Sequence, residues 1–176
     1  LSRLASLRIT SPEALDYVQQ AVELLEQMPS SRELAWACAD MAAVLTVRAR
    51  ATEALQWGRR ALALAEQVAE PEVLAYALNI CGSVELSLKY EEGALAKLER
   101  SLALAQQHGF DQKVALAYVN LAGMALVNHD YQRLLNYAEQ GLAFALRRDL
   151  DFIVAALYLR RLLGWFDVGR WRDAAE

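Results

Sequence analysis

Residues 52–65 read TEALQWGRRALALA, and this pattern of small and large apolar residues returns every 40 residues along the chain. The corresponding stretches are PEALDYVQQAVELL at 12–25, EGALAKLERSLALA at 92–105 and QRLLNYAEQGLAFA at 132–145. One column of the repeat holds Ala14, Ala54, Ala94 and Leu134, and a second column seven positions later holds Ala21, Ala61, Ser101 and Gly141. Seven residues are two turns of an α-helix, so both columns lie on one stripe of a helix. Small side chains there predict close approach of a second helix, and the larger apolar columns that begin at Val22 and Leu24 are expected to fill the space around that contact.

Four further helical stretches, at 33–47, 73–88, 114–127 and 152–166, alternate with the first four. A glycine inside a helix costs roughly 1 kcal/mol against alanine, so Gly82 and Gly123 indicate close helix contacts. The stretch LAYALNICG at 74–82 has one residue more than LAYVNLAG at 116–123, and we therefore expect these columns to slip by one residue between repeats. The turns between stretches are short, which favours antiparallel helix hairpins.

These periodicities predict an all-α fold, an α-α superhelix (solenoid) of antiparallel helix hairpins with a 40-residue repeat. We expect one domain over 1–176, with a partial hairpin at 1–29, hairpins at 30–69, 70–109 and 110–148, and a partial hairpin at 149–176. The last seven residues, RWRDAAE, place Ala174 in the first small column. We therefore expect the chain to be a fragment of a longer protein, ending in the second helix of a fifth hairpin.

The column pattern resembles the tetratricopeptide repeat over almost the whole chain. The stretch HDYQRLLNYAEQGLAFA at 129–145 looks like the second helix of that motif, and AYVNLAGMAL at 117–126 looks like the first. The common repeat of that family has 34 residues, so the helices or turns are longer here. The resemblance implies that the first helix of each hairpin faces a concave binding groove.

A narrower likeness is carried by LERSLALAQQHGFDQKVALAYVNLA at 98–122 and by RRDLDFIVAALYLRRLL at 147–163. Both resemble the helical-repeat region of large bacterial LuxR-type regulators, which include the maltose-responsive activators. Such proteins carry an N-terminal ATPase module and a C-terminal helix-turn-helix beside the repeats. The likeness implies a bacterial, cytoplasmic regulator as the parent protein.

Composition excludes several function classes. The net charge is −4 and no basic stripe is visible, which disfavours direct nucleic-acid binding. No apolar run approaches the ~20 residues that span a membrane. Phosphate-binding and nucleophile motifs are missing, and the two histidines are too far apart to hold zinc alone, so we expect no catalysis, no cofactor and no metal. Cys38 and Cys81 lie in apolar helical contexts, typical of buried free thiols in a reducing compartment.

Candidate partner-binding residues are the polar and aromatic groups of the first helices. They are Trp36, Tyr76, Asn79, Ser83, Tyr118, Asn120, Tyr158 and Arg161. Asn79 and Asn120 stand in matching N-x-x-G contexts, where the amide could bond a ligand, bond another helix or be solvated. For the tyrosines, core packing with the hydroxyl at the edge is the alternative to ligand contact. The carboxylate clamp of co-chaperone repeats is disfavoured, because the three lysines lie outside these positions.

The sequence thus predicts a non-enzymatic interaction or sensor domain of a bacterial transcriptional regulator, binding a partner protein, a peptide or a small effector on its concave face. Two alternatives stay open: a generic repeat scaffold of another signalling protein, and a small-molecule effector receptor. Self-association through exposed end repeats is also expected, because an end hairpin without a capping repeat exposes an apolar face.

Overall fold

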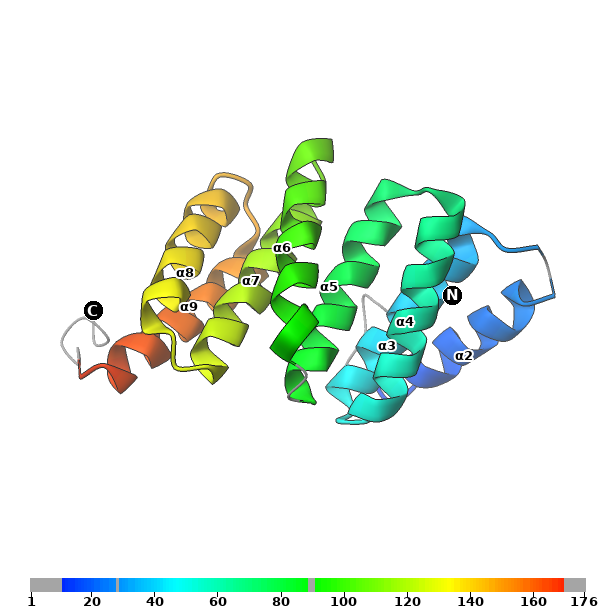
Figure 1. Cartoon of the computed structure of the whole chain (residues 1–176), viewed down its shortest axis with the longest axis horizontal. Helices are drawn as coiled ribbons and strands as arrows, with labels where there is room; N and C mark the ends of the chain where they lie inside the picture. Colours follow the sequence, from blue (N-terminus) through cyan, green and yellow to red (C-terminus); the bar gives the residue numbers. More distant parts are fainter. Residues whose placement is uncertain (1–10, 28, 89–90, 170–176) are drawn as a thin grey trace. The chain divides into compact units, whose positions relative to one another are not determined.

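The structure, a computed structural model, describes residues 11–27, 29–88 and 91–169 and is entirely helical over these ranges (Figure 1). Its helices are α2 (Ala14–Leu25), α3 (Arg32–Val47), α4 (Ala51–Val68), α5 (Pro71–Ser87), α6 (Glu91–His108), α7 (Asp111–Val127), α8 (Tyr131–Leu146) and α9 (Asp151–Asp167). The chain forms two compact units, residues 1–104 and 105–176, which divide within α6. The single-domain organisation over 1–176 stays a prediction.

The 40-residue repeat is visible in the helix bounds. The helices α4, α6 and α8 begin at residues 51, 91 and 131, and α5, α7 and α9 begin at 71, 111 and 151. The expected slip between the first helices is therefore wrong, because α5 and α7 keep the same register. Two helices depart from the 40-residue register: α2 begins at Ala14, three residues late, and α3 begins one residue late. The N-cap of α3 is Ser31, whose hydroxyl oxygen accepts a hydrogen bond from the Leu34 N–H at 3.2 Å.

The turns repeat with the same period. Residues with positive φ recur at multiples of 40 in two series: Ala49, His129 and Gly169, and Ala69, Gly109 and Asp149. At several of these turns the backbone N–H of the following residue bonds the carbonyl five positions earlier, as from Arg50 to Leu45 at 2.9 Å and from Asp130 to Ala125 at 2.9 Å. This is the Schellman cap, which satisfies carbonyls that the helix end would leave without partners.

In the first unit, α3 packs against α2, α4 and α5, and α4 also packs against α5. The predicted small columns lie in these contacts, since Ala14, Ala54 and Ala61 are all fully buried. The close contact predicted at Gly82 is confirmed: a Cβ added there would lie 2.9 Å from the carbonyl oxygen of Ala94. Small residues thus set the distance between neighbouring helices.

In the second unit, α8 packs against both α7 and α9, and α7 also packs against α9. Leu134 is fully buried, and a Cβ added at Gly141 would lie 2.7 Å from Leu157 Cδ1. The contact at Gly123 is of another kind, because the group nearest to an added Cβ is the guanidinium of Arg160, at 3.1 Å. A side chain, and not a helix backbone, approaches this glycine.

One apolar column differs from its predicted role. Val22 is 3% exposed, as expected of a residue that fills the helix contact, but Leu24 is 57% exposed. Two residues along a helix correspond to about 200° of rotation, so both cannot face the same neighbour. The expected helix start at 170–176 and residues 1–10 of the partial hairpin expected at 1–29 lie outside the described residues.

Candidate functional site

Two of the predicted residues meet in the first unit. Trp36 of α3 and Tyr76 of α5 stand 40 residues apart, at equivalent places of successive first helices, and their ring centroids are 5.3 Å apart with the planes tilted by 31°. Tyr76 is buried, whereas Trp36 is partly exposed. The pair presents an aromatic surface whose outer part is the indole of Trp36.

A buried carboxylate holds this aromatic pair. Asp40 lies one turn after Trp36 and is buried, and the Tyr76 hydroxyl donates a hydrogen bond to it. Burial of the phenol, then the negative charge of Asp40 and this bond, raise the pKa of Tyr76 well above its usual value of 10.0. Tyr76 therefore stays protonated and is fixed as a donor, which limits the motion of the ring that supports Trp36.

The two asparagines with matching sequence contexts are not structurally equivalent. With the 40-residue register, Asn79 corresponds to Val119, and Asn120 corresponds to Ile80. Asn79 is buried, and Asn120 is partly exposed. Ser83 is also partly exposed, and its hydroxyl donates to the Ile80 carbonyl of its own helix at 3.1 Å. The described structure thus places Asn79 in the packed interior, and its role in binding stays a prediction.

Tyr118 is packed inside the second unit. Its hydroxyl accepts a hydrogen bond from Gln106 Nε2 at 3.2 Å and donates one to Gln140 Oε1 at 3.3 Å. Its ring centroid lies 6.4 Å from that of Phe144 on α8. The hydroxyl therefore joins the second helices of two hairpins, which accounts for this tyrosine by helix packing.

Tyr158 and Arg161 lie together on α9. The guanidinium carbon of Arg161 is 4.7 Å from the Tyr158 ring centroid and 4.5 Å from that of Trp165. Tyr158 is exposed, and Arg161 is partly exposed. A guanidinium between two aromatic rings keeps its charge while losing freedom, which suits a planar acidic or aromatic group of a partner.

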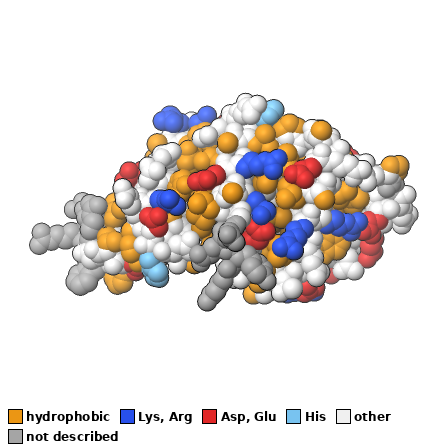
Figure 2. All heavy atoms as spheres, in the orientation of Figure 1, with side chains coloured by type: hydrophobic (Ala, Val, Ile, Leu, Met, Phe, Trp, Pro, Cys, Tyr) orange, Lys and Arg blue, Asp and Glu red, His pale blue; other side chains and the backbone are white. Residues whose placement is uncertain are grey.

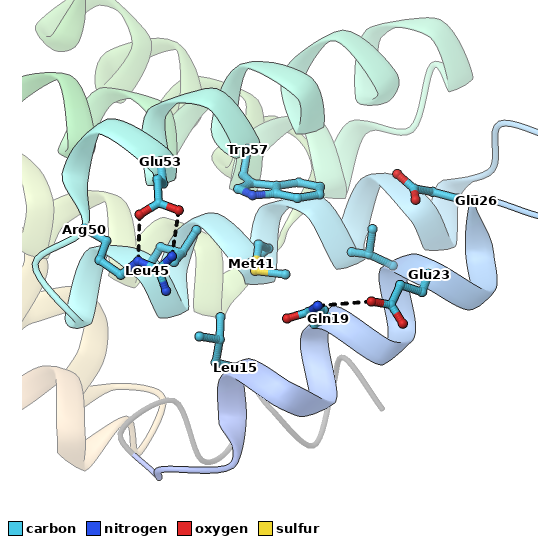
Figure 3. Close-up of a pocket in the computed structure, with 10 residues that line it drawn as sticks. Leu15, Gln19, Glu23, Glu26, Met41, Leu45, Arg50, Glu53 and Trp57 are labelled. Carbon is cyan, nitrogen blue, oxygen red and sulfur yellow. Dashed lines mark hydrogen bonds and ion pairs between the residues drawn. The ribbon is translucent and has the colours of Figure 1, made fainter.

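The structure also forms a pocket that the sequence did not predict. It has a volume of about 350 Å³ and lies between the second helices α2 and α4, with α3 beneath (Figure 3). Its lining residues are Leu15, Gln19, Val22, Glu23, Glu26, Met41, Leu45, Arg50, Glu53 and Trp57. Figure 3 shows Trp57 of α4 and the Gln19–Glu23 pair of α2 on opposite sides, with Met41 between them.

Charged groups around this pocket are mostly paired. Arg50 donates two hydrogen bonds to Glu53, at 2.7 and 2.6 Å, and this pair raises the arginine pKa and lowers that of the glutamate. Glu26 forms an ion pair with Arg60, whose guanidinium carbon also lies 5.2 Å from the Trp57 ring centroid. The signal in the sequence was the large aromatic residue at position 57 of a helix whose neighbouring positions are otherwise polar or small.

No group of three or more histidine, cysteine or carboxylate side chains that could hold a metal occurs among the described residues. The described helices also include none that is long and apolar enough to cross a membrane. Cys38 and Cys81 are buried free thiols, as predicted. Burial raises the pKa of Cys38 to about 11 and that of Cys81 to about 12, so both are unreactive at neutral pH.

The face shown in Figure 2 carries both positive and negative charges. Basic and acidic side chains lie interspersed there among apolar ones. Ion pairs also join Arg100 to Glu66 and Arg32 to Glu70. A surface of this kind suits protein contacts better than a phosphate backbone.

Comparison with known proteins identifies solved structures of the same fold as this chain. No protein-family model matches the chain, and no curated protein matches its sequence. Among solved structures, BtubC from P. vanneervenii is similar with a TM-score of 0.74 and 18% identity, over 98% of this chain and 73% of its own. A putative kinesin light chain from Podosopora anserina with nearly identical TPR-like repeats is similar with a TM-score of 0.71 and 14% identity, over 99% of this chain and 87% of its own.

A Rap protein complexed with competence and sporulation factor is similar with a TM-score of 0.70 and 17% identity. The match covers 92% of this chain, but this chain spans only 55% of the Rap protein. Together these likenesses confirm the fold class, an all-α repeat of TPR-like antiparallel hairpins.

Proposed function

We propose that this chain is a non-enzymatic interaction domain that binds a partner protein or peptide through its first helices. The observation that carries the proposal is the partly exposed indole of Trp36, packed at a tilt against a tyrosine that a buried carboxylate holds in place. Rigid aromatic anchors supply much of the energy of protein interfaces, because they bury a large area and lose little conformational freedom on binding.

The Arg161 group of α9 supports the same function in the second unit. Arginine and aromatic side chains are enriched at the energetic centres of interfaces. Here Arg161 lies between Tyr158 and Trp165, so it is already ordered before a partner arrives. A solved structure of similar fold, the Rap protein, holds a bound factor, which agrees with an interaction role for this repeat.

A selection of random peptides displayed on phage tests the interaction role. Peptides that bind the wild-type chain are measured again with Trp36→Ala, which should weaken binding at least about tenfold. The matched control is Tyr137→Ala, which removes a partly exposed aromatic side chain from the second helix α8, outside both the first helices and the pocket. If no selected peptide distinguishes the two variants, the first helices are not the binding surface.

We further propose, from the sequence likeness, that the parent protein is a cytoplasmic bacterial transcriptional regulator of LuxR type. The complete gene tests this: it should encode an ATPase motif before the repeats and a helix-turn-helix after them. A gene with neither would support the alternative of a scaffold in another signalling protein. For the effector-receptor alternative, thermal unfolding is measured with metabolite mixtures, because a ligand of the folded form raises the midpoint.

Self-association through α9 is a second proposal, carried by the exposure of its apolar stripe. Leu159 is 55% exposed, although its equivalent Val119 in α7, a helix that packs against both α8 and α9, is only 7% exposed. Phe166, two turns further along, is 64% exposed. A second copy of the chain carries hairpins of the same kind and is the proposed occupant. Sedimentation velocity should show a dimer that Leu159→Glu converts to monomer; a wild-type monomer at high concentration contradicts it.

A further inference from the structure

We propose that the pocket between α2 and α4 binds one lysine or arginine side chain of a partner protein, as a docking point separate from the first helices. The site lies on the second helices, so it goes beyond the function proposed above. Three features of the pocket carry the inference: its apolar floor, its balance of charges and its open, carboxylate-bearing rim.

The floor suits an aliphatic stem. Val22 of α2 and Met41 and Leu45 of α3 are buried and contribute to the lining, together with Leu15. Lysine and arginine bury their methylene stems on apolar surface while the charged end stays near water. An inorganic cation would leave this floor empty, so the pocket favours a cation that carries a chain of methylene groups.

The charged groups that line the pocket favour the binding of one cation. The lining contains three carboxylates, on Glu23, Glu26 and Glu53, and one guanidinium, on Arg50. Arg50 is bonded to Glu53 at 2.6 and 2.7 Å, and Glu26 is paired with Arg60. Glu23 instead accepts a hydrogen bond from the neutral amide of Gln19 at 3.1 Å. Of the three carboxylates that line the pocket, Glu23 is therefore the one for which the described residues show no ion pair with arginine or lysine.

The negative charge of Glu23 lies at the opening of the pocket. Both Glu23 and Gln19 are exposed, and Figure 3 shows them across the pocket from the Trp57 indole. An incoming side chain can therefore lay its stem over Met41 and put its cationic end beside Glu23, with the indole as the opposite wall. Cations are also attracted to the face of tryptophan, which adds to this preference.

The occupant is a side chain of a polypeptide, because the pocket opens along the groove between two helices. Gln19, Glu23 and Glu53, which form its rim, are all exposed, so backbone on both sides of an inserted side chain can follow the helices. The ligand class is therefore a polypeptide segment with one basic residue.

The test uses the probe peptide acetyl-Gly-Leu-Lys-Leu-Gly-amide and the full chain labelled with ¹⁵N. The indole N–H signal of Trp57, assigned with Trp57→Phe, should shift saturably with the lysine peptide while that of Trp36 does not. The same peptide with norleucine in place of lysine should bind much more weakly, because it keeps the stem and lacks the charge. Glu23→Gln should weaken binding of the lysine peptide about fivefold, the size of one exposed charge pair.

Glu139→Gln on α8 is the matched control, since it removes an exposed carboxylate from the middle of a second helix outside the pocket and should leave binding unchanged. Equal binding of the norleucine peptide would overturn the proposal, as would an equal loss in Glu23→Gln and Glu139→Gln. A third arm uses 1,5-diaminopentane: if it binds more tightly than the peptide, the site takes a free diamine and the polypeptide occupant is wrong. Movement of the Trp36 signal alone would assign the peptide to the first helices and also reject the site.

Discussion

Gly141→Ala and Gly123→Ala should change stability in opposite directions, although both add one methyl group to the middle of a helix. Alanine is favoured over glycine inside a helix by about 1 kcal/mol, and this gain applies to both positions. The difference lies in what the new methyl group meets. At Gly141 an added Cβ would lie 2.7 Å from Leu157 Cδ1 and 2.8 Å from Tyr118 Cβ.

Carbon atoms pack at about 3.5–4.0 Å, so the methyl group at position 141 lacks about 1 Å of space. Tyr118 Cβ is joined directly to the α7 backbone and cannot rotate away, so α7 and α8 have to separate. Overpacking of this kind costs about 1–3 kcal/mol, which exceeds the helix gain. We expect Gly141→Ala to lower the free energy of unfolding by roughly 1 kcal/mol as the balance of these two effects.

At Gly123 the nearest group to an added Cβ is the end of the Arg160 side chain, at 3.1 Å. A guanidinium on a long stem can move by a few tenths of an ångström, so the helix gain of up to about 1 kcal/mol should dominate. Urea unfolding followed by far-ultraviolet circular dichroism measures both variants. Equal stabilities of the two variants, or a Gly141→Ala protein more stable than wild type, would refute the packing argument.

Four further outcomes concern individual side chains. Ala69→Gly should raise the free energy of unfolding by about 0.5–1 kcal/mol. The left-handed backbone costs alanine about 1–2 kcal/mol, and the greater entropy of glycine in the unfolded chain cancels only part of the relief of this strain. An unchanged midpoint in urea would contradict this. Tyr76→Phe should destabilise by about 1–2 kcal/mol at pH 7 by leaving buried Asp40 without its donor. Because the pKa of Tyr76 is raised in the folded protein, its contribution to wild-type stability should be intact below pH 10 and be lost as pH rises above it. The stability of the phenylalanine variant should fall less over the same range. Parallel pH profiles of stability for the two proteins would exclude the assigned bond. Cys38 and Cys81 should resist iodoacetamide at pH 8 in the folded protein and react in urea, which mass spectrometry of intact protein detects; rapid labelling without urea would show that they are accessible.

The features predicted correctly from the sequence are those that depend on one helix at a time. Small residues spaced by two helical turns identify a buried stripe whatever neighbour covers it, and Ala54 and Ala61 are both fully buried. The 40-residue period itself follows from the same columns, and it reappears in the starts of six helices. Local periodicity was therefore sufficient for the fold class.

The exposure of the candidate binding residues could not be predicted to the same degree, because it depends on which side of each helix its neighbours cover. Asn79 and Asn120 share a sequence context, but their registers differ by one residue. One residue is a rotation of about 100°, enough to place one amide in the interior and the other at the surface. When the two N-x-x-G stretches are aligned by their glycines, the asparagines coincide. When they are aligned by the starts of α5 and α7, the asparagines differ by one residue.

The pocket was missed for a related reason. Glu23 and Glu53 are 30 residues apart, and Met41 lies between them on a third helix. Their proximity follows from the distance between α2 and α4, which many packed side chains determine together. Only Trp57 was visible in the sequence as a large aromatic residue on a mainly polar helix face.

The left-handed turn residues bear on how this fold tolerates change over evolutionary time. The same turn geometry is held by alanine at 49 and 69, by histidine at 129, by aspartate at 149 and by glycine at 109 and 169. The turn is defined by hydrogen bonds between peptide groups, which every residue except proline can make, so substitutions there alter stability slightly without moving the helices. Sequence drift at these turns therefore leaves few invariant residues. That is consistent with a chain that overlays solved structures at only 14–18% sequence identity.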